Sequence, residues 1–587
     1  MLKRKSITKF GAVSVLLAMM CSVIPAQAAY TPSVSVWDGS VNTNWLADQG
    51  ITADSQLLNR GLKLDNGQLY KQDSPTIKIN SAADFIAFRN DVCEGMDASA
   101  TTAWGQLNKP YLSATVELMC DIDLNGLNLK YGIGGMHDYA AFFGRFDGNG
   151  HTIKNLKINP NEPDAAAVQP GPNARCGDTS SNWVVDHSTS PEAVGLFPYS
   201  KFIGDQDGSS IINLHLENVE ITLPDTLPDE TTFYAGSLAG RLYNGVQVAS
   251  CSAKNVKFLG GPTEVVGGGS LSGKYLRIGG LIGVSQTGGF ISNVYVNGVD
   301  FTGLETEASK SWTYLSGLFD FNSSVMLTNA YTANVTFDTG KANNIDTFCY
   351  RESTATLIPS NEVKGDYTAN GNRYAYFYSD NWKRYVGGEE VENPTYNNDI
   401  VVKLLTNDLD TATDWMTSQG GRIHMINMYS FTGEYPKTGS ERGLWGRNCK
   451  FYANGSEVTT LAAAQASGEE ITASFETLNT LGEAQTVNII IAKYQGTRLV
   501  EAKSEIVTVP VNAIIDAMSS YKKFGRAVAK VIRDGNNEWT IPTSDGTNAT
   551  QIISGISIDP SGCTEIKAFM WSDLNDLWAL SVNGALN

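Results

Sequence analysis

Charged side chains are scarce in this chain of 587 residues. They make up 18% of it, and acidic residues outnumber basic ones by 61 to 43. A helical bundle or coiled coil of this length would contain far more Glu and Lys. An acidic surface also repels phosphate backbones and anionic lipids. We therefore expect neither a helical bundle, nor a nucleic-acid partner, nor membrane insertion.

Histidines and clustered cysteines are also lacking. The chain has only five histidines, no CxxC pair and no G-x-S-x-G segment. A structural zinc site needs clustered Cys or His ligands, and a serine hydrolase needs its nucleophile beside a histidine. The segment from Gly268 to Lys274 partly matches a phosphate-binding loop. Because Tyr275 replaces the magnesium-binding Ser or Thr, we interpret it as a loop between strands. We expect no catalytic residues and no cofactor from these motifs.

Long apolar runs are absent after the N-terminus, so no later segment reaches the roughly 18 apolar residues of a membrane span. Residues 1–28 have the pattern of a cleavable export signal, with basic residues up to Lys9, an apolar stretch and small residues ending at Ala28. We therefore predict a secreted or extracellular protein that could associate with the cell surface. The signal carries four basic and no acidic residues, so its removal changes the net charge from −18 to −22.

Cysteine is sparse as well, and seven residues remain once Cys21 leaves with the signal. An export compartment permits disulfides, but an odd number leaves at least one thiol unpaired. Cys93 and Cys120 form one expected pair, because they lie in consecutive elements on either side of a loop. Cys449 and Cys563 form the other, because they could join the ends of the last domain.

Glycine is abundant, with 57 residues, and it recurs in a repeating pattern from about residue 140 to 340. Each unit has a Gly-Leu or similar start, a turn rich in Gly or Asn, and an alternating apolar strand. The anchor positions Asn213, Ser250, Asn293 and Asn329 are 37, 43 and 36 residues apart. Such a period predicts a stacked solenoid, with apolar ladders inside, glycines at tight corners and asparagines bonding along the axis. A β-sandwich with coincidental repeats is the alternative.

Three segments carry a resemblance to a known family. They are the unit Gly279–Val296 (GGLIGVSQTGGFISNVYV), the lead-in from Phe143 to Ile153, and Thr115 to Leu124. Over about residues 80–340 the chain resembles the GLUG-motif family of secreted bacterial proteins. The resemblance implies a right-handed parallel β-helix. It implies no activity, because the motif occurs in adhesins, peptidases and uncharacterised surface proteins.

The repeats divide the chain into an export signal at 1–28, a lead-in at 29–80, a β-helix at 81–345 and a closing region at 346–448. Ser81 is a good N-cap, and Phe85, Phe88 and Val92 follow at helical spacing. We predict that this helix caps the first rung. The fold class is therefore all-β, a parallel β-helix with an N-terminal helical cap.

Residues 449–587 form the last predicted domain. Val487 to Tyr494 and Leu499 to Val509 flank a turn at Gln495-Gly496, which indicates a β-hairpin. Two more strands are expected from Ile552 to Ile558 and from Glu565 to Trp571. The region resembles the small Ig-like β-sandwich that ends many secreted proteins of Gram-positive bacteria. A helical stretch at 513–532 departs from that pattern, and we interpret it as an insertion.

Two acidic patterns are candidates for chemistry. Asp121 to Gly126 copies the start of a calcium loop, but Gly132 stands where an EF-type loop needs a bidentate acid. Calcium is therefore a weak cofactor candidate, and alternation instead predicts that Asp121 and Asp123 face water. A polysaccharide-active enzyme needs paired acids, or a base with a charge-neutralising group. The outward acids Glu117, Asp121, Asp123 and Glu217 are better explained as a solvated face.

Aromatic residues are the candidate ligand-binding side chains, since their rings can stack on sugars. Packing over the end of the solenoid is the simpler explanation. The insertion that contains one of them is long enough to be a binding loop, or to be disordered. The candidates are Tyr374, Tyr376 and Tyr378 on one strand face, Trp382 just after it, and Trp183 in the long insertion at about 162–191.

These patterns favour an adhesin-like protein, secreted or on the cell surface, that binds glycans or proteins without catalysis. A polysaccharide-active enzyme, either a lyase or a glycoside hydrolase, is the first alternative. A structural subunit of an extracellular assembly is the second. Acids grouped with Arg or Lys would favour the enzyme, whereas a smooth face would favour binding or structure. The sequence leaves self-assembly open.

Overall fold

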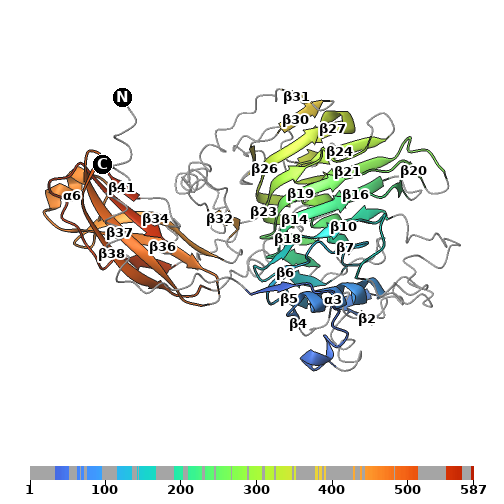
Figure 1. Cartoon of the computed structure of the whole chain (residues 1–587), viewed down its shortest axis with the longest axis horizontal. Helices are drawn as coiled ribbons and strands as arrows, with labels where there is room; N and C mark the ends of the chain where they lie inside the picture. The colour runs from blue at the N-terminus through green and yellow to red at the C-terminus, as the bar shows by residue number, and fades with distance from the viewer. Residues whose placement is uncertain are drawn as a thin grey trace.

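The computed structural model of this chain consists mostly of β-strands, with few helices. It describes 33–51, 76–94, 115–134, 142–166, 191–201, 209–351, 443–512, 550–571 and 584–587, with short gaps in some of these ranges, and a few strands within 62–71 and 377–438. The predicted export signal lies outside the described residues. Most strands belong to a β-solenoid, whose stacked turns run from blue to yellow in Figure 1.

Short elements lead into the solenoid. Helix α3 forms where the sequence predicts a helix, because Ser81 Oγ accepts a hydrogen bond from the Asp84 backbone N–H at 3.1 Å. Its apolar residues Phe85, Phe88 and Val92 are fully buried. The elements in this part are β1 (Val34–Val36), η1 (Ala47–Gln49), the antiparallel pair β2 (Leu62–Asp65) and β3 (Gln68–Lys71), β4 (Thr76–Ile79) and α3 (Ala82–Glu94).

One large sheet runs along the solenoid. Strands of successive turns pair in parallel, as β14 does with β19, β19 with β23, and β23 with β26. Parallel pairing across one repeat is what a stacked solenoid requires, and it confirms the predicted parallel β-helix and its repeats. Besides β1 and β4, the strands are β5 (Thr115–Leu118), β6 (Asp121–Asp123), β7 (Asn128–Leu129), β8 (Arg145–Asp147), β9 (Thr152–Lys154), β10 (Lys157–Ile158), β13 (Ser210–Ile212), β14 (His215–Thr222), β18 (Gln247–Ala249), β19 (Ser252–Leu259), β23 (Phe290–Asp300), β26 (Met326–Asp338), β29 (Phe377–Asp380), β30 (Lys383–Val386) and β31 (Glu389–Val391).

Two five-stranded parallel sheets complete the turns of the solenoid from β11 onward. The first elbow sheet contains β11 (Ala193–Val194), β16 (Thr232–Gly236), β21 (Tyr275–Gly279), β24 (Trp312–Ser316) and β27 (Asn344–Asp346). The second elbow sheet contains β12 (Phe197–Lys201), β17 (Ala239–Tyr243), β22 (Ile282–Gln286), β25 (Phe319–Asn322) and β28 (Cys349–Arg351). Shorter elements are β15 (Thr226–Leu227), β20 (Glu264–Val265) and η4 (Thr339–Lys341).

The Gly-Leu starts of the repeats form the sharp turn between these two sheets, which we call the elbow. Its segments are 195–196, 236–238, 279–281 and 316–318. An added Cβ at Gly280 would lie 2.1 Å from the carbonyl oxygen of Gly317, one turn later. The equivalent distance from Gly195 to the Gly236 carbonyl oxygen is 2.5 Å. Successive turns therefore approach too closely at these two positions for a side chain.

The solenoid interior consists of ladders of apolar side chains. Phe258, Phe301 and Phe337 stack on successive turns, with ring centroids 5.1 and 5.2 Å apart, and all three are fully buried. The predicted alternation at the start of the solenoid is also confirmed, since Val116 and Ile122 are fully buried. Each rung is thus held by contacts with its neighbours in the stack.

A row of asparagines, the asparagine ladder, lies at a bend of the long strands. Asn155, Asn218 and Asn255 have φ angles of 55°, 56° and 54°. Asn218 Nδ2 donates to Asn155 Oδ1 at 3.2 Å, and Asn255 Nδ2 donates to Asn218 Oδ1 at 3.1 Å. Asn155 Nδ2 donates in turn to Asp123 Oδ1 at 2.7 Å. Asparagine bonds along the axis in this column, which is not the column of anchors predicted from the repeats.

The predicted anchors Asn213 and Ser250 lie at a second bend, with φ angles of 51° and 54°. Asn213 Nδ2 donates to Asp147 Oδ1 at 3.1 Å, one turn earlier. The left-handed conformation that these positions need is one that Asn adopts more readily than most residues. The repeat therefore places asparagine where the backbone must bend.

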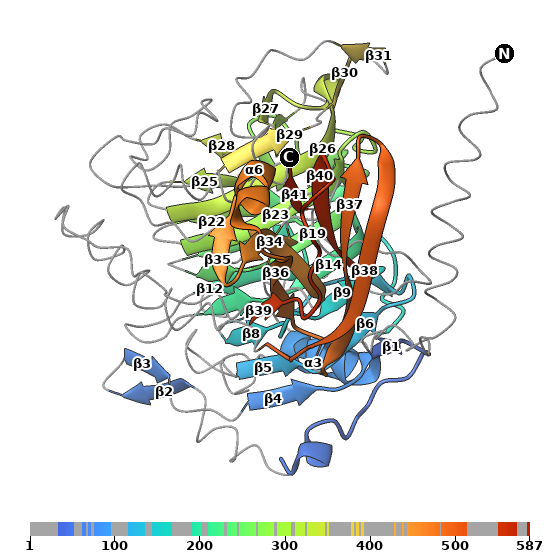
Figure 2. The same cartoon turned by 90° about the vertical axis from the view of Figure 1, so that its left-hand side faces the viewer.

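A second body consists of two four-stranded antiparallel sheets, drawn in orange and red in Figure 2. The predicted hairpin is present, and its turn at Gly496 has a φ of 59°. The sheets contain β35 (Ser456–Val458), β34 (Leu444–Ala453), β36 (Ile471–Asn479) and β39 (Thr550–Ile553), and β38 (Arg498–Val509), β37 (Gln485–Gln495), β40 (Glu565–Trp571) and β41 (Gly584–Leu586). Helix α6 (Leu461–Ser467) and the pair β32 (Met428–Tyr429) and β33 (Lys437–Thr438) complete the described elements. The predicted helical stretch at 513–532 lies outside the described residues.

The described cysteines correct both disulfide expectations. Cys449 and Cys563 are free thiols, and so is Cys120, the expected partner of Cys93. Cys120 Sγ and Cys563 Sγ each donate to a backbone carbonyl oxygen at 3.2 Å. Cys449 lies so close to Gly584 that an added Cβ there would be 2.2 Å from its Sγ. Burial raises the pKa of Cys449 to about 12 and that of Cys120 to about 11.

Candidate functional site

The aromatic residues that the sequence favours lie mostly outside the described part of the chain. Trp183, Tyr374, Tyr376 and Trp382 all fall in ranges that the structure does not describe. Tyr378 lies in β29, where its backbone pairs with that of β26. These five residues remain predictions. A different aromatic cluster lies among the described residues.

This cluster, the aromatic strip, consists of Tyr275, Trp312 and Tyr314 on the first elbow sheet. Tyr275 and Trp312 pair in register on β21 and β24. Their ring centroids are 6.5 Å apart with an interplanar angle of 22°, and Tyr275 stacks on Tyr314 at 6.2 Å. Trp312 is 49% exposed, whereas Tyr314 is 8% exposed. The strip therefore exposes one large aromatic ring, Trp312, which stacks on Tyr275.

Polar side chains join the two elbow sheets beside the aromatic strip. Arg277 on β21 forms an ion pair with Asp320 on β25, with 2.6 Å between Nη1 and Oδ2, and both side chains are buried. The Arg277 guanidinium also lies 5.4 Å from the centroid of the Tyr314 ring. One turn earlier, Arg241 lies 4.9 Å from the centroid of the Tyr234 ring. These contacts fix the ring at the base of the aromatic strip.

The polar residues between the two elbow sheets also include Glu192 and Tyr199, which lie earlier in the chain. Tyr199 donates its hydroxyl to Glu192 Oε2 at 2.7 Å. Burial, followed by the Glu192 carboxylate, holds the pKa of Tyr199 well above its ordinary value. Tyr199 is therefore a hydrogen-bond donor and no general base at neutral pH. We call the whole row the polar seam, and it consists of Glu192, Tyr199, Tyr234, Arg241, Arg277 and Asp320.

A second polar cluster lies on the large sheet. Glu117 on β5 and Asp147 on β8 are register partners on neighbouring strands. Arg145 contacts Asp147 Oδ2 at 3.1 Å, and Asn213 donates to Asp147 Oδ1 at 3.1 Å. Burial raises the pKa of Glu117, and the nearby Asp147 carboxylate adds to this effect. The environments of these two carboxyl groups therefore differ, as they do in acid and base pairs of enzymes.

The other outward acids bond within the chain. Asp121 is only 7% exposed, which corrects the expectation that it faces water. Its Oδ1 lies 3.0 Å from His151 Nδ1 and also accepts a backbone N–H. Asp123 Oδ1 accepts a hydrogen bond from Asn155, the first residue of the asparagine ladder. Glu217 is half-buried in β14. Within the described ranges, no group of three His, Cys, Asp or Glu side chains could hold a metal ion.

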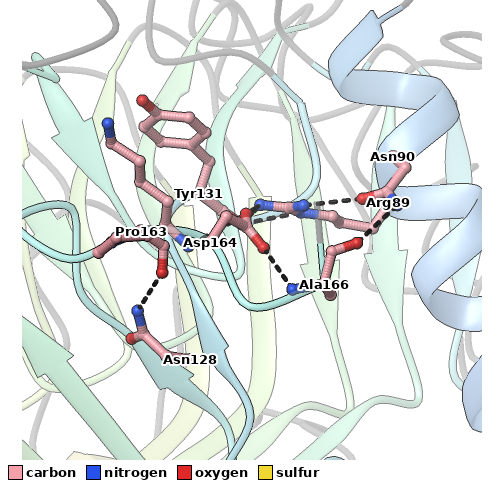
Figure 3. A network of polar contacts seen from close by, with 8 residues as sticks. Arg89, Asn90, Asn128, Tyr131, Pro163, Asp164 and Ala166 are labelled. Carbon is pink, nitrogen blue, oxygen red and sulfur yellow. Dashed lines mark hydrogen bonds and ion pairs between the residues drawn. The ribbon is translucent and has the colours of Figure 1, made fainter. Parts of the chain in front are cut away.

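A third polar network connects helix α3 to the start of the long insertion (Figure 3). Arg89 forms a buried ion pair with Asp164, and its Nε donates to the Tyr131 carbonyl oxygen at 3.0 Å. Asn90 Nδ2 donates to the Ala166 carbonyl oxygen at 3.2 Å, and Asp164 Oδ1 accepts the Ala166 N–H at 3.1 Å. The groups of this network satisfy one another. It anchors residues 164–166 to the helix, and we assign it a structural role.

The aromatic strip was not predicted from the sequence, although the repeats contain a signal for it. Tyr275 and Trp312 each lie four residues before the elbow of their own repeat, at Gly279 and Ser316. They therefore occupy the same repeat position. Aligning the units on the Gly-Leu start, instead of on the asparagine anchors, would have placed the two rings in one column.

No protein-family model matches this chain, and no curated protein or solved structure was found to match it. In the part of the chain that the structure describes, no helix combines the length and the apolar character needed to cross a bilayer.

Proposed function

We propose that this chain is a secreted or cell-surface protein of adhesin-like type that binds glycans without catalysis. The aromatic strip is the observation that carries this proposal. Trp312 is half exposed and stacks on Tyr275, which also stacks on Tyr314. The buried Arg277 of the Arg277–Asp320 pair contacts the Tyr314 ring, so the strip is an apolar surface supported by polar groups. Sugar-binding sites combine these two elements, because the ring stacks while polar groups bond the hydroxyls.

Two sequence features support the same proposal. The export-signal pattern at 1–28 directs the chain to the compartment where extracellular glycans occur. The repeats resemble those of the GLUG-motif family, which includes adhesins. A solenoid also presents a long, regular surface on which a polymer can lie.

Two finer features of the fold belong to the proposal. We infer that α3 caps the first rung of a right-handed helix, because Phe88 packs against Phe142 and Phe146 with centroids 6.2 and 6.1 Å apart. We also infer that the second body is an Ig-like sandwich, which its two antiparallel sheets and shared apolar core support. A sandwich of this kind would act as a spacer or attachment module.

A glycan array probed with the mature protein tests the proposed function. We expect wild-type protein to bind a subset of glycans and Trp312→Ala to lose that binding by about tenfold or more, the equivalent of one stacked ring. Trp571→Ala, which removes a half-buried Trp from the second body, is the matched control and should bind normally. If the wild-type protein bound no glycan on the array, the proposed glycan binding would be contradicted.

A polysaccharide-active enzyme is the second candidate, and the Glu117–Asp147 pair with Arg145 favours it. Glu117 would act as the acid, because its pKa is raised, and Asp147 would be the second carboxyl group of the pair. The test measures the release of products from polysaccharides by the wild-type protein and three variants. Release that is lost in Glu117→Gln and Asp147→Asn, but kept in Glu220→Gln, would establish an enzyme and reject non-catalytic binding. Glu220 is a suitable control because it is a half-exposed acid of the same sheet.

A further inference from the structure

The aromatic strip ends at Trp312 because the next strand starts late. β24 begins at Trp312, whereas β27, the following strand of the sheet, begins at Asn344. Asn344 pairs with Tyr314, so no residue of β27 lies opposite Trp312. Continuing the register back by two residues brings Ala342 to the level of Trp312. The column of large side chains stops there.

The two faces of the Trp312 indole therefore differ. Tyr275 stacks against one face, at 6.5 Å and 22°. Tyr314 has strand partners on both sides and is 8% exposed, but Trp312 has a strand partner on one side and is 49% exposed. Elsewhere in the solenoid such columns continue from turn to turn, as Phe258, Phe301 and Phe337 do. The open face is thus a consequence of strand length.

We propose that the open face of Trp312 is a stacking subsite for a single pyranose ring, which continues the aromatic column beyond β24. This proposal rests on the proposed function and names the place and the chemistry of one sugar contact. The C–H groups of a pyranose ring carry partial positive charge and match the negative face of an indole. A pyranose ring is about as wide as the side chain that would otherwise follow in the column.

A polar residue lies one position further along, opposite Thr313. Asn343 is exposed, and its Oδ1 accepts the Thr313 backbone N–H at 2.7 Å, which fixes the amide. The Asn343 backbone N–H also donates to the Thr313 carbonyl oxygen at 2.9 Å. A fixed amide on the strand position next to Trp312 can orient sugar hydroxyls at little entropic cost. The subsite therefore combines a stacking surface with a preorganised polar group.

The test uses two variants, each of which adds an aromatic ring at one end of the column. Ala342→Phe would add a ring at the register level of Trp312, at a position that is 8% exposed and packs in the solenoid core. Thr232→Phe would add one at the far end of the column, beyond Tyr275. Binding of hexasaccharides of glucose, xylose and mannose is measured by calorimetry for both variants of the mature protein. We expect about tenfold weaker binding for Ala342→Phe and unchanged binding for Thr232→Phe.

Trp312→Ala and Trp312→Phe keep the proposal testable if Ala342→Phe fails to fold, as thermal unfolding would reveal. We expect the first to abolish stacking and the second to retain most of it. Normal binding by a folded Ala342→Phe, or by Trp312→Ala, would overturn the subsite while leaving glycan binding intact. Absence of binding by the wild-type protein to all three hexasaccharides would overturn the subsite, and the array then decides whether the proposed function also fails.

Discussion

Glu117 and Asp147 lie opposite each other on neighbouring strands, in different surroundings. Asp147 receives a hydrogen bond from Asn213 and contacts Arg145, so its negative charge is compensated. Glu117 is partly buried and faces that charge, which raises its pKa. Desolvation and like-charge repulsion both disfavour its ionised form. The pair therefore makes the stability of the fold dependent on pH.

The sign of this dependence follows from proton binding. The unfolded chain releases the Glu117 proton near the ordinary value of 4.5, whereas the folded chain retains it to higher pH. Stability falls as pH rises through that interval, because the folded state then binds more protons. We expect Glu117→Gln to be more stable than wild type at neutral pH and equally stable below about pH 4. Urea unfolding across this pH range measures the difference.

The half-exposed Glu220, which pairs with Lys157 at 3.4 Å, provides the control. Glu220→Gln should show no gain at neutral pH, because a surface ion pair contributes little. A gain for Glu117→Gln that is the same at every pH would reject the ionisation argument. It would point instead to an effect of packing.

Arg277 and Asp320 illustrate why single residues of the site escape prediction. They are 43 residues apart and lie on strands of two different sheets. Sequence periodicity gives the spacing of repeats but no information on which side chains meet across the elbow. The exposure of Trp312 is equally hard to predict from the sequence, because it depends on where β27 begins. Both facts are set by loop lengths that differ from one repeat to the next.

At the scale of elements, the asparagine ladder stabilises the bend of the long strands. Each member adopts a left-handed conformation, which costs other residues about 1 kcal/mol or more. Each also donates its amide to the residue one turn earlier, so the row forms a continuous chain that ends on Asp123. Such bonds contribute about 1 kcal/mol each when they are well formed. The ladder therefore aligns the rungs as well as joining them.

Removing one member should break two of these bonds. We expect Asn218→Ala to lower the free energy of unfolding by about 2–3 kcal/mol, counting both bonds and the backbone strain. Asn125→Ala is the matched control, because Asn125 has a φ of 52° and lies outside the ladder. Chemical denaturation gives the free energy of unfolding of both variants, and the difference between their losses is the contribution of the ladder hydrogen bonds. Equal losses for both would show that the ladder contributes only conformational preference.

The sequence was sufficient to predict the elements of the solenoid but not their register. Glycines at the elbow and alternating apolar residues appear directly in the repeats, since sterics and burial impose them locally. The anchors chosen from the repeats, such as Asn213, mark a bend correctly. The ladder runs through Asn155, Asn218 and Asn255 instead, because lateral alignment depends on how each rung packs on the last.

At the scale of the whole molecule, two separate apolar cores divide the described chain. One includes interior residues of the solenoid such as Phe258, and the other includes residues of the second body such as Phe475. No residue belongs to both clusters. Units with their own cores can unfold separately, since cooperativity depends on shared contacts.

We therefore expect two transitions in calorimetry of the mature protein. A fragment that starts at residue 443 should retain the second transition at an unchanged temperature, because all of its described strands pair among themselves. Circular dichroism of the fragment provides an independent check of its β-structure. One transition for the full chain, combined with an unfolded fragment, would show that the two cores depend on each other.

The parallel pairing of rungs also decides how the molecule carries load. Hydrogen bonds between successive turns point along the solenoid axis, so a pull along that axis strains one end rung at a time. A pull along the strands strains all bonds of a strand together, which resists far better. A polymer held at the first elbow sheet and dragged in the strand direction would therefore meet the stiffest direction of the solenoid, whereas tension on its ends would peel it turn by turn.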